Sequence, residues 1–182
     1  MKICKHLKWE IIGIIAIFLI GSLWHNIFDI LGENIIIGMI APVNESTWEH
    51  WKLGLAPVFI YGAIQYPFIK NEVKNYLFSR MVGVIVLVVV CFGLIEITHV
   101  VVPDASFEIM MVVHLVTYFL GIAAGQISAY YVSSRFAENK TLWYVGIILI
   151  FINLVVFIIF TFNPPKYEYF KDSSTGQYGI KK

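Results

Sequence analysis

Long apolar runs recur along the chain, and they constrain the fold more than any other feature of the sequence. Several reach about 18 residues or more, the length that an α-helix needs to cross a hydrocarbon core of ~30 Å. The chain has 182 residues, of which 59% are hydrophobic and 14% are charged. A water-soluble domain of this size could not bury so many apolar side chains. We therefore predict an all-α, polytopic membrane protein that forms a single membrane domain over residues 1–182.

Five spans are expected in this domain. The second is the weakest, because Pro57 and Pro67 interrupt it and each proline removes a helix hydrogen bond. The apolar segment 32–45 is too short to cross, so we expect it to be re-entrant or to lie in the interface. The expected spans are 9–31, 51–69, 80–102, 106–132 and 141–162, followed by a tail at 163–182.

Lysine and arginine residues predict the orientation of the spans. They precede the first span and occupy the connections between spans two and three and between spans four and five. The loops of the opposite side carry only Lys52. Because cytoplasmic loops are rich in these residues, we expect a cytoplasmic N-terminus and an external C-terminus. No A-x-A-like cleavage site interrupts the first apolar run, so it is interpreted as a retained span.

Other compositional signals limit the partners. The formal net charge is +1 and no basic patch is visible, so nothing indicates a nucleic acid partner. Membrane lipids are the expected partners. Cys4 and Cys91 are too few for a disulfide framework.

Ionisable residues of the spans gather in the predicted outer half. His25 and Asp29 are four residues apart and share a helix face. Glu96 and His99 form a Glu-x-x-His pair, the arrangement that carboxylate-bridged metal sites in helical bundles use. His114 is expected about 15 Å from the outer edge. A buried charge costs roughly 2.5–3.5 kcal/mol, whereas an interhelical hydrogen bond returns ~0.6 kcal/mol, so a function is favoured over structural hydrogen bonding.

The segment "PVNESTWEH", residues 42–50, adds polar groups at the outer mouth of the second span. Ser46 and Glu49 have the Ser-x-x-Glu spacing of a capping box, which is the structural alternative for these two residues. A cap explains neither Glu45 nor His50, for which the alternative is a solvated loop.

These residues suggest a metal-dependent membrane hydrolase that acts on a lipid or a lipid-linked substrate. Imidazoles and carboxylates suit zinc best among the divalent transition metals. Glu45 and Glu49 are the candidate catalytic residues, one of them as a general base. The predicted metal ligands are His25, Asp29, His50, Glu96, His99 and His114. A cation or proton transporter, a metal-binding protein without catalysis and a structural accessory subunit are the alternatives.

The tail carries too many aromatic residues for a solvated segment. We predict that it folds back across the external mouth, with Tyr169 and Phe170 near Trp48 and Trp51, and limits access to the pocket. The alternative is a set of interfacial anchors, since tyrosine favours the headgroup layer.

The "APVNESTWEHWKL" stretch, the Glu-x-x-His span and the ending "NPPKYEYFKDSSTGQYGI" resemble a family of small bacterial multi-pass membrane proteins of unknown function. The resemblance covers nearly the whole chain. It implies a bacterial cytoplasmic membrane, an external loop at residues 42–50 and a tail that belongs to the fold. It implies no substrate.

Overall fold

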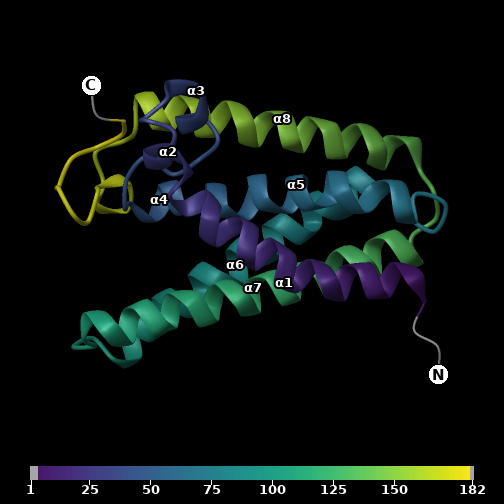
Figure 1. Ribbon diagram of the computed structural model, residues 1–182, viewed down its shortest axis with the longest axis horizontal. Coiled ribbons are helices and arrows are strands. Elements are labelled where there is room, and N and C mark those ends of the chain that lie inside the picture. The colour runs from purple at the N-terminus through teal and green to yellow at the C-terminus, as the bar shows by residue number, and fades with distance from the viewer. Residues whose placement is uncertain (1–3, 181–182) are drawn as a thin grey trace.

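The computed structural model describes residues 4–180 and shows an all-helical bundle (Figure 1). Its five long helices are α1 (Lys5–His25), α5 (Lys52–Ile69), α6 (Tyr76–Val101), α7 (Phe107–Arg135) and α8 (Lys140–Phe162). The short helices are α2 (Ile27–Ile30), α3 (Ile35–Gly38), α4 (Thr47–His50) and the 3-10 helix η1 (Glu168–Phe170). Within residues 4–180 no strand forms, and one isolated antiparallel bridge joins Lys171 to Tyr178.

Four of the long helices, α1, α6, α7 and α8, are long and apolar enough to cross a membrane. The chain is therefore a multi-pass helical membrane protein. The fifth predicted span, α5, is not among these four, so a five-span topology is not confirmed. Helix α5 can be less apolar than the other four because ten of its 18 residues are buried inside the bundle, Lys52 and Gln65 among them. The polar side chains of Lys52 and Gln65 thus face protein.

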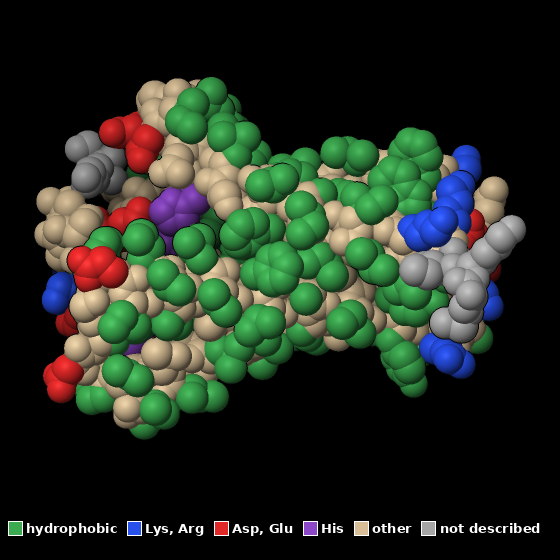
Figure 2. Space-filling model, turned by 60° about the horizontal axis from the view of Figure 1, so that its bottom comes forward, with side chains coloured by type: hydrophobic (Ala, Val, Ile, Leu, Met, Phe, Trp, Pro, Cys, Tyr) green, Lys and Arg blue, Asp and Glu red, His purple; other side chains and the backbone are tan. Residues whose placement is uncertain are grey.

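The two ends of the bundle differ in charge. We call one the histidine end; it holds α2, α3, α4, the α6–α7 connection and the C-terminal tail (Figure 1). The opposite lysine end holds the start of α1 and the α5–α6 and α7–α8 connections. Figure 2 shows acidic and histidine side chains at the histidine end, and most lysine and arginine side chains of this face at the lysine end. The two termini lie at opposite ends (Figure 1).

Small residues let α6 and α7 pack closely. A Cβ added at Gly125 would lie 2.5 Å from the carbonyl oxygen of Gly83, and one added at Gly121 would lie 2.8 Å from that of Leu87. Such close backbone approach is typical of glycine at membrane helix interfaces. The α6–α7 hairpin is thereby fixed as one wall of the bundle.

A buried ionic network closes the lysine end. Arg80 is fully buried and donates to both carboxylate oxygens of Glu10, at 2.6 and 3.0 Å. The Nε2 atom of His6 lies 3.0 Å from the same carboxylate. Arg80 is the first residue of the expected span 80–102, and the structure buries it in α6, where it joins α6 to α1.

The first helix ends earlier than predicted. The expected span 9–31 is α1, which ends at His25, and the chain bends at Asn26 before α2 begins. The segment that follows, residues 26–46, packs against the histidine end, and we call it the lobe. The indole of Trp24 donates to the Ile40 carbonyl at 3.0 Å, and Lys52 donates to backbone carbonyls of the lobe. This lobe carries the chain from α1 to α4.

Candidate metal site

Three predicted residues converge at the histidine end. His25 is the last residue of α1, Glu45 lies in the loop before α4, and His50 is the last residue of α4. The Nε2 atoms of the two imidazoles lie 2.9 Å apart. The Glu45 carboxylate lies 3.4 Å from Nε2 of His50 and 3.7 Å from Nε2 of His25. One ligand atom from each residue lies within 4.8 Å of the others. We call these residues the His–Glu–His group.

Local helix capping orients His50. The Ser46 hydroxyl accepts from the Glu49 N–H at 3.3 Å and caps the start of α4. The second half of the predicted capping box does not form, because the Ser46 N–H donates to the Asn44 side chain and the Glu49 carboxylate is bonded elsewhere. One turn later, Nδ1 of His50 lies 2.7 Å from the Ser46 carbonyl oxygen. A carbonyl only accepts, so Nδ1 carries the proton and donates. The Nε2 lone pair of a neutral His50 then points to His25 and Glu45, which is the tautomer that a metal ligand needs.

The C-terminal tail holds the Glu45 backbone. The Glu45 N–H donates to a carboxylate oxygen of Asp172 at 3.3 Å, and the Ser173 hydroxyl donates to the Glu45 carbonyl at 3.1 Å. The neighbouring Asn44 amide donates to the Gly179 carbonyl at 3.0 Å. The tail is therefore part of the structure that positions one of the three candidate ligands.

The protonation equilibria of the group are coupled. The hydrogen bond from His50 holds the pKa of Glu45 below its usual range. Burial lowers the pKa of His50, but the contacts with the Glu45 carboxylate and the Ser46 carbonyl outweigh burial, so the net pKa lies above the ordinary value. Glu45 is thus a carboxylate that stabilises a positive charge next to it.

The group is open on one side. The side chains of His25, Glu45 and His50 are 30%, 50% and 25% exposed. In Figure 2 a histidine side chain lies in a hollow of the histidine end, beside acidic side chains. Two histidines and one glutamate with an open fourth position form a ligand set that catalytic zinc sites use. The donor types and their convergence fit a divalent transition metal.

Glu49 is not part of this group. Its carboxylate is buried, lies 2.6 Å from the ammonium of Lys52 and accepts from the Val43 N–H at 3.0 Å. Lys52 also donates to Thr161 of α8 at 2.6 Å. The structure therefore gives Glu49 an ion pair that joins α4, α5 and α8 and does not bring it to the candidate ligands.

The remaining predicted ligands do not join the group. Glu96 and His99 lie 3.9 Å from each other and are 61% and 52% exposed. His114 on α7 is exposed and close enough to interact electrostatically with His50, Glu45 and His99. Asp29 is exposed on α2, beyond the bend that separates it from the helix of His25. No second group of three potential metal ligands is found within residues 4–180.

Sequence reasoning missed the residues that support the group. Asp172 and Ser173 contact Glu45 from more than 120 positions away, and no local pattern reveals such a pairing. The "KDSSTG" segment did predict a turn. The pairing of Glu49 with Lys52 had a visible signal, because the two opposite charges are only three positions apart in the sequence.

This fold and geometry define a class of protein: a helical, multi-pass membrane protein with a candidate metal site of three residues. The chain belongs to the Family of unknown function (DUF6512), which matches residues 1–180. That match agrees in extent with the resemblance seen along nearly the whole sequence. Neither a curated protein nor a solved structure matches the chain.

Proposed function

We propose that this protein is a zinc-dependent hydrolase of the bacterial cytoplasmic membrane, with its metal on His25, Glu45 and His50. The observation that carries the proposal is the convergence of two imidazole Nε2 atoms and a carboxylate within 4.8 Å. The hydrogen bond that orients His50 supports it. The charge difference between the two ends supports five spans with the histidine end outside the cell.

The open side of the group supports catalysis over a purely structural metal. Structural zinc takes four protein ligands, whereas catalytic zinc keeps a position for water and lowers the pKa of that water to about 7. Glu45 acts as a ligand in this proposal. Glu49 is engaged by Lys52, so the general base is sought at His114, the exposed histidine of α7 that interacts electrostatically with His50 and Glu45.

A lipid or lipid-linked molecule is the proposed substrate class. The helices next to the group expose large apolar side chains, such as Val100 at 82% and Phe107 at 79%. These surfaces face hydrocarbon in a membrane, so an amphiphilic substrate can approach the site sideways. Transport is less well supported, because substrate sites of transporters lie near the bilayer midplane and this group lies at one end.

Metal analysis of the purified protein tests the proposal. We expect about one zinc ion per chain, with a rise in Tm when zinc is added to metal-free protein. His25→Ala and His50→Ala should lower zinc affinity by at least roughly 100-fold, the upper range for loss of an outer-shell partner. His99→Ala, which removes an exposed histidine outside the group, is the matched control.

Two outcomes would count against the proposal. Wild-type protein that is free of metal and whose Tm does not respond to zinc would exclude the site. Protein that binds zinc but hydrolyses no ester or phosphoester in a panel of lipid-linked substrates would support the alternative of metal binding without catalysis.

A further inference from the structure

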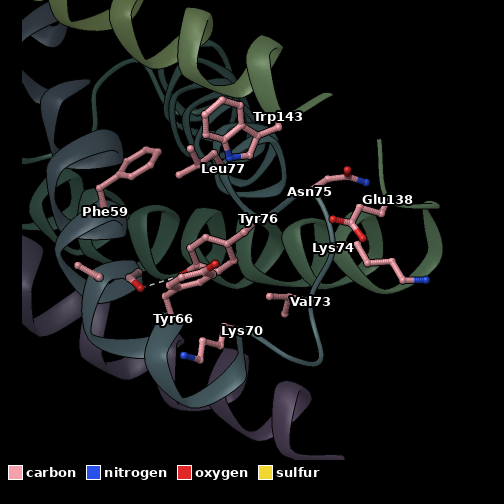
Figure 3. A pocket seen from close by; sticks show the side chains of 12 residues that line it. Phe59, Tyr66, Lys70, Val73, Lys74, Asn75, Tyr76, Leu77, Glu138 and Trp143 are labelled. Atoms are coloured by element: carbon pink, nitrogen blue, oxygen red, sulfur yellow. Dashed lines mark hydrogen bonds between the residues drawn. The ribbon is translucent and has the colours of Figure 1, made fainter. Parts of the chain in front are cut away.

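A second cavity lies at the lysine end, away from the His–Glu–His group. It encloses about 580 Å³ between α5, the start of α6 and the start of α8. That volume falls within the range of roughly 300–1,000 Å³ typical of small-molecule sites. Figure 3 shows aromatic rings from three helices around it, with Phe59 and Trp143 on one side and Tyr66 and Tyr76 on the other.

The walls of this cavity between the helices are mostly aromatic and aliphatic, and two of the rings, Tyr66 and Tyr76, carry a hydroxyl. The Tyr76 hydroxyl donates to the Gly62 carbonyl at 2.8 Å and lies 3.0 Å from the Gln65 side chain, so its polar atom is already bonded. Trp143 and Tyr66 are 47% and 44% exposed. Exposed Trp and Tyr at the end of a membrane helix are typical of the headgroup boundary. The cavity therefore opens where acyl chains meet headgroups.

The rim of the cavity carries a net positive charge. Lys70 and Lys74 of the α5–α6 connection and Glu138 of the α7–α8 connection line it, and all three are exposed. In Figure 3 the side chains of Lys74 and Glu138 lie next to each other on one side, and the side chain of Lys70 lies below Tyr66 with its ammonium directed away from that of Lys74. No ion pair of either lysine is found among the described residues. Two cationic groups next to an apolar cavity match an anionic amphiphile.

The rim is built rigidly by long-range hydrogen bonds. The Lys74 N–H donates to the Ser133 carbonyl at 3.0 Å. The Asn75 amide donates to the Ala137 carbonyl and accepts from the Asn139 N–H, both at 2.9 Å. The α5–α6 connection is thereby fastened to the end of α7 and the start of α8. These bonds fix the backbone from which the Lys74 side chain extends.

Close helix packing places Trp143 over the cavity. A Cβ added at Gly146 would lie 2.6 Å from the backbone nitrogen of Phe78, so α8 contacts the start of α6 directly. Trp143 lies almost one turn earlier on α8 and forms one wall.

We propose that this cavity binds one anionic phospholipid, with an acyl chain against the aromatic walls and the headgroup phosphate at Lys70 and Lys74. Basic pockets between membrane helices are a recognised way to bind anionic headgroups. The proposal is independent of the metal site, because no residue is shared.

Native mass spectrometry tests it on the full-length protein, with equal amounts of phosphatidylglycerol and phosphatidylcholine added. We expect one phosphatidylglycerol to be retained preferentially. The double variant Lys70→Ala/Lys74→Ala should weaken retention roughly 30-fold, as expected for two surface lysines. Lys5→Ala/Lys8→Ala removes the same charge from exposed residues of α1 that do not line the cavity, and should retain the lipid.

A larger side chain in the cavity wall tests the proposal without changing the charge of the rim. Ala63 lines the cavity, and Ala63→Phe should reduce lipid retention while inorganic phosphate fails to displace the lipid from wild-type protein. The proposal would be overturned if both lysine double variants lost lipid retention equally. It would also be overturned if folded Ala63→Phe retained the lipid, or if inorganic phosphate displaced it. If the Lys70→Ala/Lys74→Ala variant does not fold, Ala63→Phe decides.

Discussion

The Nε2 atoms of His25 and His50 lie 2.9 Å apart, at the ends of two helices that the chain joins through a folded lobe. Two neutral imidazoles can share this distance only if one nitrogen carries a proton, because two lone pairs at this separation repel each other. A metal ion bound by both nitrogens would replace that proton, and the two rings would move apart slightly, because tetrahedral zinc with Zn–N bonds of about 2.0–2.1 Å holds two nitrogens roughly 3.3 Å apart. The contact between these two residues therefore leads directly to a competition between protons and metal.

The first prediction is that zinc binding weakens as pH falls through a value above 6.5, the ordinary pKa of histidine. The raised pKa of His50 means that the metal-free protein holds a proton there at a pH where an unperturbed histidine is neutral. Zinc must displace this proton. Glu45→Gln removes the carboxylate that raises the pKa, so the proton affinity of His50 should fall. Isothermal titration with zinc at several pH values measures the protons released.

Zinc binding weakens at low pH, but the stability of the metal-free fold should be greatest at mildly acidic pH. A raised His50 pKa stabilises the fold below pH 6.5 and loses this effect as pH rises through the folded pKa. A lowered Glu45 pKa stabilises above 4.5 and loses this effect as pH falls through the folded pKa. Both contributions are present between these two values. Thermal melts of metal-free Glu45→Gln that lose no stability relative to wild type in this window would contradict the assignment.

The second prediction concerns the buried pair of Glu49 and Lys52. Lys52→Ala leaves a buried carboxylate without its cation, which costs about 3–5 kcal/mol. It also removes the ammonium that bonds the Gly38 and Ala41 carbonyls, so the lobe should detach. Chemical denaturation measures the loss. The double variant Glu49→Gln/Lys52→Met removes both charges and should recover part of the stability. A Lys52→Ala protein as stable as wild type would show that the pair is not a structural link.

Much of the helical fold could be predicted from apolar runs, and the site could be predicted only in part. The expected span 80–102 is α6 at Tyr76–Val101, because hydrophobicity alone determines such a helix. The Glu-x-x-His spacing of Glu96 and His99 correctly placed both on one face, but spacing does not say which way that face points. The burial of Arg80 depends on Glu10, a partner 70 positions away that no local pattern identifies.

The third prediction concerns Gly179, where the tail returns to the bundle. Its φ of +69° is unfavourable for residues with a Cβ, and a Cβ would lie 2.7 Å from the Thr161 carbonyl oxygen. Gly179→Ala should cost about 1–3 kcal/mol and release the tail, because strain and contact add. Limited proteolysis and thermal melts measure this. Gly176→Ala is the matched control, since its φ is +72° but its Cβ would meet nothing closer than 3.8 Å. Equal effects would mean that strain alone matters.

The fourth prediction concerns orientation. Cys4 is exposed at the lysine end and Cys91 is buried, so a membrane-impermeant thiol reagent should reach neither in intact cells if the lysine end is cytoplasmic. Ser173→Cys, in a Cys4→Ser background, places an exposed thiol at the histidine end and should be labelled without permeabilisation. The reverse pattern would invert the topology and place the His–Glu–His group in the cytoplasm.

The last prediction concerns the tail as a lid. The expected contacts are confirmed, because the Trp51 indole donates to the Tyr169 hydroxyl at 2.6 Å and the rings of Trp48 and Phe170 lie 5.2 Å apart. Restriction of access stays a prediction. Burial raises the pKa of Tyr169 to about 12, so its hydroxyl stays neutral over the accessible pH range, and the oxygen accepts from Trp51 throughout.

Thiol labelling of His50→Cys, with both native cysteines replaced, measures access to the group. Deleting residues 166–182 should increase the labelling rate, and Tyr169→Ala should do so to a smaller extent, because it removes only the bond to Trp51 and the ring contacts of Tyr169 with Trp51 and Phe170. Tyr167→Ala is the matched control, since that ring is 72% exposed and loses little on removal. The deletion also removes Asp172 and Ser173, which hold Glu45, so Tyr169→Ala is the decisive variant. Unchanged labelling in a folded Tyr169→Ala protein and in the deletion would show that the tail supports Glu45 but does not cover the site.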